Sequence, residues 1–564
     1  MFIGIDVGGT YTDAVLTDGR KIVNKHKILT CHDDLLASLL GALDAVTAGQ
    51  DTACIQRVVL STTLITNIIA EKKYPSVVLI LEPGPGLSHS EYKFDAPTYI
   101  VPGAVDYRGR EIIPLGREEV FKAGVDMVYM GYDRVAAVGK FSCRNNSHEL
   151  AMKQLLEETF SGLTVEMGHT VSGHLNFPRR IAGTMLTAAT KELFAKFVAN
   201  VMESLKARKI TAPAFILKAD GGTLPLESAL EMPVETIFSG PAASTLGAMS
   251  LSPKGQTSVV VDIGGTTTDL ALILSGEPLL ASKGAKIEEL FTHIKSFAVK
   301  SIPLGGDSAV AVRDGQMEIL PERRGPAYCL GGEGATPTDA LKFLNRVEIG
   351  DMSRAVEIMN RLAEETGKTP EETANDIIRQ ASQIVVKAIK KMFISWEQEP
   401  AYHVWEIVQE TKIRPQNVVG VGGAAGGLVP DVARQLGCKP IIPTHAEVAN
   451  ALGAAVAQPT MTVNLRVDTE QGSYTVVEDG TSGAVPTGRM FREEDALKLA
   501  RDKLFQRAED LNIKAYVSKT EVVHSEVFNM VRGWTTTGKI YDICMQTPRD
   551  ILFYLGQEGS ENEQ

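Results

Sequence analysis

A short motif occurs twice in the sequence, and its residue types suit the binding of phosphate and Mg²⁺. The first copy reads DVGGTYTD at residues 6–13, and the second reads DIGGTTTD at residues 262–269. Paired glycines let a phosphate approach backbone N–H groups closely, and threonine hydroxyls add further donors. A carboxylate next to such a turn can hold Mg²⁺ through water or orient an attacking oxygen. We therefore predict that the two copies bind the phosphates of one nucleotide from two sides.

Both copies contribute predicted site residues. Asp6, Asp262 and Asp269 are expected to place the metal ion and protons, and Asp6 and Asp262 are the expected metal ligands. The residues expected to bind the nucleotide here are Gly8, Gly9, Thr10, Thr12, Asp13, Gly264, Gly265, Thr266 and Thr267. One copy alone would fit an ordinary glycine-rich hairpin about as well, but its repetition favours a shared ligand.

A third glycine-rich segment, VVGVGGAAGGLVP at residues 418–430, reads as a strand, a turn and the start of a helix. Gly422, Gly423 and Gly426 are expected to let a flat base and its ribose lie against the backbone. Gly437 would end the helix as a C-cap. Taken alone, this segment would favour a strand-to-helix turn without a ligand.

These segments need elements to position them, and the flanking residues predict such elements. Each motif copy lies between two short apolar runs, which predicts a strand, a turn and a second strand. Apolar residues recur with helical spacing over residues 181–207. Thr369 followed by Pro370 and Glu372 predicts the start of another helix.

The last hundred residues differ in pattern from the rest. Strands are expected at residues 463–467, 474–477 and 517–527, and an amphipathic helix at residues 493–511. This pattern predicts a small α+β domain at the C-terminus. The polar, acidic tail at residues 557–564 is expected to be disordered.

Composition limits the class of protein. The 564 residues carry a formal charge of −12, with 44% hydrophobic and 22% charged residues. These values fit a soluble protein of several domains and argue against nucleic acid or an anionic membrane as a partner. No apolar run is long enough to span a membrane, and a motif beginning at Asp6 leaves no room for a signal peptide. Six scattered cysteines predict reduced thiols and a cytoplasmic location.

The twin hairpins and the later glycine-rich turn resemble the superfamily of actin, heat-shock chaperones and sugar kinases. Further strings resemble the hydantoinase A / 5-oxoprolinase family. They are STTLITN at 61–67, DGG at 220–222, PVETIFSGPAA at 233–243, GPAYC at 325–329, TDA at 338–340 and NALG at 450–453. The resemblance implies an α/β, two-lobed actin-like ATPase fold of duplicated ribonuclease H-like domains. We expect an N-terminal lobe at 1–180, a hydantoinase A region at 181–460 and the small C-terminal domain at 461–564.

The resemblance also implies a reaction. It points to an ATP-dependent hydrolase that uses ATP and Mg²⁺ to phosphorylate a carbonyl of a lactam, hydantoin or similar small molecule before ring opening. It leaves open a second divalent metal, and it suggests a B-type hydantoinase subunit as partner and a homo-oligomer. Two alternatives remain at this point: an ATPase that reactivates or assembles a partner protein, and a small-molecule kinase.

Two places depart from the family pattern. The family commonly has histidine where this chain has Leu60, and an Asp-Val-His string where it has Ala298, Val299 and Lys300. These residues are poor metal ligands, and Asp307 is a nearby carboxylate that could compensate. His169 and His445 match family histidines, and the sequence leaves structural and functional roles open for both.

Overall fold

The first motif copy lies in a six-stranded sheet of a computed structural model, which describes residues 1–31, 33–86, 94–398, 414–478, 480–487, 490–517 and 519–555. The predicted disordered tail lies outside the described residues. The strand order of the sheet is β12-β11-β4-β1-β2-β3. The strands are β1 (Phe2–Val7), β2 (Tyr11–Thr17), β3 (Ile22–Leu29), β4 (Arg57–Thr62), β11 (Ala214–Leu217) and β12 (Thr223–Pro225). Strands β1 and β2 form the predicted hairpin, and β1, β4 and β11 run parallel.

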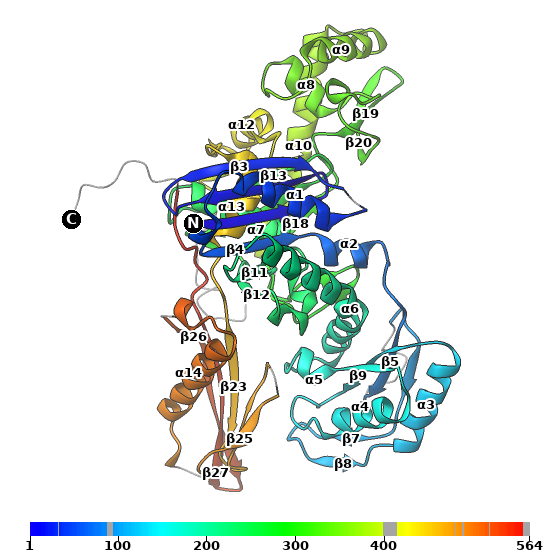
Figure 1. Ribbon diagram of the computed structural model, residues 1–564, viewed down its shortest axis with the longest axis vertical. Coiled ribbons are helices and arrows are strands. Elements are labelled where there is room, and N and C mark those ends of the chain that lie inside the picture. The colour runs from blue at the N-terminus through cyan, green and yellow to red at the C-terminus, as the bar shows by residue number, and fades with distance from the viewer. Residues whose placement is uncertain are drawn as a thin grey trace, which may run out of the picture.

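The second motif copy lies in a sheet of the same construction, with the order β15-β14-β13-β21-β22. The strands are β13 (Ser258–Ile263), β14 (Thr268–Leu274), β15 (Glu277–Pro278), β21 (Asn417–Val421) and β22 (Lys439–Ile441), and β18 (Val299–Ile302) also pairs with β14. Strands β13 and β14 form a hairpin, and β13, β21 and β22 run parallel. The chain therefore repeats one arrangement, a hairpin followed by parallel strands, as expected for duplicated domains (Figure 1).

Two helices fill the space between the sheets, namely α7 (Ser239–Leu251) and α13 (Ala449–Val456). Their small side chains form one hydrophobic core with Val15 and Leu217 of the first sheet and Val260 of the second. On the outer faces, α1 (Leu35–Thr47) and α6 (Phe177–Ala207) cover the first sheet, and α10 (Pro370–Glu397) and α12 (Ala425–Leu436) cover the second. The predicted helix start at Thr369 is confirmed, because its hydroxyl and the Glu372 carboxylate form a capping box.

Glycine lets α7 and α13 approach closely. A Cβ atom added at Gly453 would lie 1.8 Å from the carbonyl oxygen of Ala243, and one at Gly247 would lie 2.0 Å from that of Ala449. Any larger residue must push the helices apart. The contact therefore fixes the distance between the two lobes.

Gly453→Ala is accordingly expected to reduce the free energy of unfolding by about 3 kcal/mol or more, because the added methyl group meets rigid backbone. Chemical denaturation followed by circular dichroism measures this change. Gly426→Ala is the matched control, since a Cβ atom there meets nothing within 4 Å. Equal stability of the two variants would contradict the packing described here.

Two further parts are attached to the lobes (Figure 1). One is a parallel sheet in the order β10-β9-β5-β6, shown at the lower right. Its elements are β5 (Val77–Glu82), β6 (Thr98–Ile100), β9 (Arg134–Gly139), β10 (Thr164–Met167), α3 (Arg117–Tyr129) and α4 (Ser147–Thr159), beside β7 (Ala104–Val105) and β8 (Glu111–Ile113). The other lies at the top and contains β19 (Ser308–Arg313), β20 (Gln316–Arg323), α8 (Pro337–Phe343) and α9 (Met352–Thr366).

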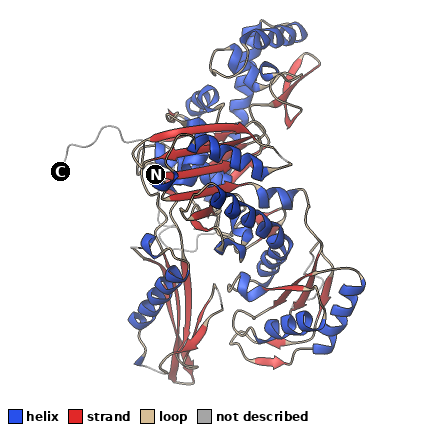
Figure 2. Cartoon of the chain, viewed as in Figure 1, coloured by secondary structure: helices blue, strands red, loops and turns tan. Residues whose placement is uncertain are grey.

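The C-terminal region is the predicted small α+β domain (Figure 2). One helix, α14 (Glu493–Asp510), packs on an antiparallel sheet in the order β25-β24-β23-β27-β26. The strands are β23 (Thr462–Asp468), β24 (Ser473–Val476), β25 (Ser482–Ala484), β26 (Glu521–Arg532) and β27 (Thr535–Gln546).

The strand pairing bears on the expected division of the chain. Strands β11 and β12 follow residue 180 yet complete the first sheet, so a boundary at 180 would divide that sheet. We therefore propose that the N-terminal lobe continues through β12. The expected boundary near 460 falls between α13 and β23. Among the described helices, none has the length and apolar character needed to cross a bilayer.

Candidate functional site

The two glycine-rich turns face one another where the lobes meet. A Cβ atom added at Gly265 in the second turn would lie only 3.5 Å from the Thr10 hydroxyl in the first. Arg323, at the end of β20, donates a hydrogen bond of 3.4 Å to the same Thr10 hydroxyl. We call the two turns (residues 8–10 and 264–267) and the side chains that contact them the hairpin junction. Its geometry brings both predicted phosphate-binding segments to one place.

Carboxylates lie in equivalent places beside both turns. Asp6 pairs across the strands with Asp13, and Asp262 pairs with Asp269. Residues directly opposite each other in antiparallel strands project from the same face, so each hairpin presents two carboxylates together. Asn450, near the start of α13, donates a hydrogen bond of 3.2 Å to Asp262 Oδ2. It also lies close enough to Asp6 to lower the pKa of that carboxyl group. One amide therefore stands beside the carboxylates of both lobes.

Burial dominates the electrostatics of these carboxylates. It raises the pKa of Asp6 to about 6 and that of Asp262 to about 7, and the negative charge of Asp269 adds to the shift at Asp262. Burial also raises the pKa of Asp269. At Asp13 burial again raises the pKa, against an ion pair of 2.6 Å with Lys27. Without a cation, burial therefore favours the protonated carboxyl groups, and a bound cation would favour their charged forms.

The residues fit a magnesium ion bound together with phosphate. Asp6 Oδ1 is buried and has no hydrogen-bond partner in the structure. Mg²⁺ usually takes one or two carboxylates and completes its shell with water and phosphate oxygens. Asp6 and Asp262 meet that requirement. Over the described residues, no group of three or more histidine, cysteine, aspartate or glutamate side chains forms a metal cage.

The raised pKa of Asp262 predicts a pH-dependent stability in the absence of divalent cations. Between the ordinary value of 3.8 and the folded value of about 7, the folded chain holds a proton that the unfolded chain has lost. The parent therefore loses up to about 1.4 kcal/mol per pH unit as the pH rises through this window. Asp262→Asn cannot titrate, so we expect it to melt above the parent in EDTA at pH above about 7.

Thermal melts of parent and variant across this pH range measure the effect. The difference in melting temperature should shrink as the pH falls toward 3.8, because both chains are then uncharged at this position. Asp18→Asn, in an exposed turn of the first sheet, controls for general effects of removing a charge. A pH-independent difference at position 262 would show that the carboxyl is not held protonated.

A loop from the second lobe supports the second turn. The amides of Gly306 and Asp307 donate to the carbonyl oxygens of Gly264 and Gly265 at 2.9 and 2.8 Å. The Asp307 carboxylate forms an ion pair of 3.0 Å with Arg323, which also reaches Thr10. Asp307, which the sequence suggested as a compensating carboxylate, therefore lies at the hairpin junction, where it holds the Arg323 guanidinium in place.

The third glycine-rich segment packs beside Asp262. Gly422 has φ of 88°, and a Cβ atom there would lie 2.8 Å from Asp262 Oδ1, so only glycine fits. Gly423 and Gly426 differ, because both are exposed and a Cβ atom at either meets nothing within 4 Å. These two glycines leave open surface at the start of α12, as a bound adenosine requires. Gly437 ends α12 in the left-handed conformation, as predicted.

Not every predicted residue faces this open surface. Thr12 is fully buried, and its hydroxyl lies 3.0 Å from that of Thr30, which donates to Gly8 O. Asp13 is occupied by Lys27. We propose that these two residues shape the first turn, whereas the exposed Thr266 and Thr267 are free to contact phosphate.

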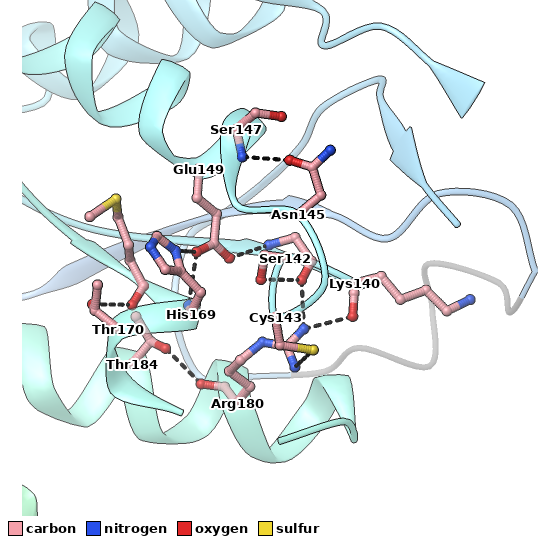
Figure 3. Close-up of polar contacts among 12 residues, drawn as sticks. Lys140, Ser142, Cys143, Asn145, Ser147, Glu149, His169, Thr170, Arg180 and Thr184 are labelled. Atoms are coloured by element: carbon pink, nitrogen blue, oxygen red, sulfur yellow. Dashed lines mark hydrogen bonds and ion pairs between the residues drawn. The ribbon is translucent and has the colours of Figure 1, made fainter. Parts of the chain in front are cut away.

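The residues singled out by comparison with the family pattern, whether they match it or depart from it, lie in different places. Leu60 is a core residue of β4, and its neighbour Ser61 lies close enough to Asp6 to lower the pKa of that carboxyl group. Lys300 lies in β18, where burial lowers its pKa. His445 contacts Lys25 of β3 at 3.1 Å, joining the second lobe to the first. His169 lies elsewhere, in a buried network beside β9 (Figure 3).

Sequence reasoning missed Asn450 and Arg323 as site residues. Asn450 belongs to the NALG string, which carried a family match but no chemistry that could be assigned. Arg323 comes from a hairpin in the part attached to the second lobe, and no local motif surrounds it. Only the tertiary structure brings either side chain to the carboxylates.

Family comparison covers most of the chain. Residues 180–463 match the family described as Hydantoinase/oxoprolinase, and residues 2–160 match the Hydantoinase/oxoprolinase N-terminal region. Among curated relatives, the caprolactamase subunit alpha of Pseudomonas jessenii is 26% identical over 521 residues, covering 83% of this chain and 72% of the relative.

Solved structures share the architecture. Acetone carboxylase in its nucleotide-free structure aligns with a TM-score of 0.73 at 17% identity, covering 100% of this chain and 89% of that chain. The ATP-dependent caprolactamase of Pseudomonas jessenii aligns with a TM-score of 0.71 at 19% identity, covering 97% and 87%. At these identities the likeness concerns the fold, and it confirms the predicted two-lobed actin-like ATPase architecture.

Proposed function

The chain belongs to the hydantoinase/oxoprolinase family, and from this premise we propose that it is an ATP-dependent hydrolase of the C–N bond in a cyclic amide or a related carbonyl compound. The observation that carries the proposal is the hairpin junction. Two glycine-rich turns face each other beside Asp6 and Asp262, and Asn450 stands next to both carboxylates. This arrangement supports the binding of a chain of phosphates between the two lobes. The ATP-dependent caprolactamase among the structural neighbours supports the choice of a cyclic amide.

The chain's own groups have defined tasks in this proposal. Backbone N–H groups of the two turns and the hydroxyls of Thr10, Thr266 and Thr267 bind phosphate oxygens. Arg323 stands beside Thr10, where its charge can stabilise a transferring phosphoryl group. Asp262 stands directly before the second turn, where its carboxylate would help to hold the metal ion. Mg²⁺ bound with ATP would offset the negative charge on the phosphates.

The reaction balances as three steps. The amide carbonyl oxygen attacks the terminal phosphorus of ATP, and the bond from that phosphorus to the ADP oxygen breaks. A first water adds to the activated carbon, and the C–N bond opens to free the amine and leave an acyl phosphate. A second water hydrolyses the acyl phosphate to the carboxylic acid and inorganic phosphate. Phosphorylation supplies the good leaving group that an amide lacks.

A steady-state ATPase assay with a panel of lactams tests the proposal. We expect a lactam to stimulate phosphate release, with one ring opened for each ATP consumed. A stable phosphorylated product would instead identify a small-molecule kinase. Stimulation by a protein partner without any lactam effect would identify a reactivation or assembly factor.

We also propose a partner subunit and self-association. The caprolactamase relative is named as a subunit alpha, which supports a second, B-type subunit for this chain. The assay is therefore run with and without the product of a neighbouring gene. Sedimentation of the chain alone tests the homo-oligomer that we propose. The free cysteines of the described residues, two of them exposed, support a cytoplasmic location.

A further inference from the structure

A cavity of about 420 Å³ lies where the first lobe, the attached parallel sheet and the C-terminal domain meet. Its walls come from the end of β11, the loop after α5 (Gly168–Val171), the segment before β18, and β23 with α14. In Figure 1 the labels of β11, α5 and β23 surround this region. No residue of the two phosphate turns or of the turn at 422–426 is among its lining residues. The cavity is thus separate from the hairpin junction.

Its position relates it to the junction nonetheless. Strands β1, β4 and β11 are parallel neighbours, so their C-terminal ends lie at the same edge of the sheet. The first phosphate turn follows β1, and the cavity residues Lys218 and Asp220 follow β11. Two strand spacings, about 10 Å, separate these strands. Pockets at junctions between domains are typical places for small ligands.

Charged side chains of both signs line the cavity. Lys218 and Asp220 are nearly buried, at 9% and 5% exposure, and their charged atoms lie 3.5 Å apart. On the opposite side, Arg507 and Glu478 are separated by 3.7 Å. Both distances exceed those of a short charged hydrogen bond. Each acidic side chain of these pairs also accepts a hydrogen bond from the backbone, Asp220 from Gly222 and Glu478 from Asn464.

Glu235 is another acidic residue that lines the cavity. Its backbone carbonyl accepts a hydrogen bond of 2.8 Å from the Ala219 amide, which fixes it beside the end of β11. Its carboxyl group interacts with the charges of Lys218, Lys295 and Arg507, and burial raises its pKa. A carboxyl group in this setting can accept an N–H bond from a ligand while the neighbouring cations bind an oxygen.

Neutral groups complete the walls. The Ser172 hydroxyl lies 2.8 Å from His293 Nδ1, and the rings of His174 and His293 lie 5.4 Å apart. Burial lowers the pKa of His293 to about 3, so this pair carries no charge at neutral pH. The apolar lining includes Val171, Leu224, Met232, Val234, Met461 and Leu511. These side chains suit the hydrocarbon part of a small molecule.

A buried network holds the loop that carries Ser172 and His174 (Figure 3). Glu149 accepts hydrogen bonds from the His169 amide at 2.8 Å and from the Gly139 amide at 2.8 Å, and it lies 2.5 Å from His169 Nδ1. Arg180 is fully buried and donates to the carbonyl of His174 at 2.7 Å. Side chains positioned in this way form a wall before any ligand arrives.

We propose that this cavity binds a small molecule that presents an oxygen acceptor and an N–H donor a few atoms apart, namely an amide or the amino acid formed from it. The oxygen would lie at Lys218 and Lys295, and the N–H group at Glu235. The inference that a small molecule binds here rests only on the charged residues and the apolar wall of the cavity. The choice of an amide and its amino acid as ligands rests on the proposed function.

Titration calorimetry of the full chain without nucleotide tests the proposal. Pyrrolidinone serves as the amide probe and γ-aminobutyrate as its open-chain amino acid. At least one of them is expected to bind at millimolar concentration or tighter. Glu235→Gln and Lys295→Met should each weaken that binding by about tenfold or more, because each removes a charged hydrogen-bond partner. Glu231→Gln is the matched control, since Glu231 is 80% exposed at the rim and pairs with Lys191.

The outcomes separate this inference from the proposed function. Binding of pyrrolidinone alone assigns the cavity to the cyclic form, and binding of γ-aminobutyrate alone assigns it to the open form. Binding that both variants leave at the parental strength would overturn the proposal, and so would no binding of either probe while Mg·ATP binds normally. Cavity binding without any lactam-stimulated ATPase would instead contradict the proposed function and leave this site standing.

Discussion

Asp6→Asn and Asp262→Asn are each expected to lower ATP turnover by about a hundredfold or more, or roughly 2.7 kcal/mol of activation free energy. Both side chains stand directly before a phosphate turn, and Asn450 lies beside both, donating a hydrogen bond to Asp262 and lowering the pKa of Asp6. Negative charge develops on the phosphoryl group as it is transferred. To stabilise that charge, the metal ion and the carboxylates that hold it must be correctly positioned. An amide at either position keeps the shape but removes the charge.

Nucleotide affinity should change much less, by no more than about tenfold. Ground-state binding rests largely on backbone N–H groups and threonine hydroxyls, which these substitutions leave in place. Calorimetric titration with Mg·ATP and a steady-state ATPase assay together measure the two effects. Asp18→Asn in the exposed turn after β2 should leave both at the parental level.

An alternative role for these aspartates is to tie down their own turns, as aspartate often does. The structure speaks against it, because Asp6 Oδ1 accepts no hydrogen bond from the residues that the structure describes. The polar neighbours that lower the pKa of this carboxyl group include Ser61 and Asn450, which lie outside its turn. The alternative predicts a lower melting temperature with turnover scarcely changed. If both variants hydrolyse ATP at the parental rate, the catalytic assignment is wrong.

Local spacing made the hairpins and several element ends predictable from sequence. Each motif copy carries its strands and its turn within a few residues, and the capping box at Thr369 and the C-cap at Gly437 are equally local. The boundary at residue 180 was harder to place because a parallel sheet is inserted before β11 returns to the first lobe. The residues of a strand do not reveal that it pairs with a strand on the other side of such an insertion.

The candidate site likewise contains some residues that the sequence could predict and others that it could not. Aspartates and glycines of the turns were named from their motifs, whereas Asn450 and Arg323 reach the junction only through packing of distant elements. The cavity beyond β11 is the extreme case, since its walls come from segments on both sides of the second hairpin in the chain. No charge pattern or periodicity within one segment could have predicted that Lys218 and Arg507 line the same cavity.

Gly423→Val is expected to weaken Mg·ATP binding by about a hundredfold or more while leaving the fold intact. The position is exposed, it is absent from the residues with positive φ, and a Cβ atom there meets no other atom within 4 Å. A valine side chain therefore costs the free protein little, but it occupies the surface on which we place the adenosine. A loss of this size is about 2.7 kcal/mol, more than one ordinary hydrogen bond contributes.

Valine variants at two other glycines, Gly422 and Gly334, serve as controls for stability and nucleotide affinity. Gly422→Val should unfold the chain at lower temperature, because φ is 88° there and a Cβ atom would lie 2.5 Å from the carbonyl oxygen of Ile263. Gly334→Val, in another open position, should alter neither stability nor nucleotide affinity. Gly423→Val alone should separate the two properties, with a parental melting temperature in the absence of ligand and a much smaller stabilisation by Mg·ATP. Parental affinity in that variant would move the adenosine away from the start of α12, and with it the role assigned to Gly426.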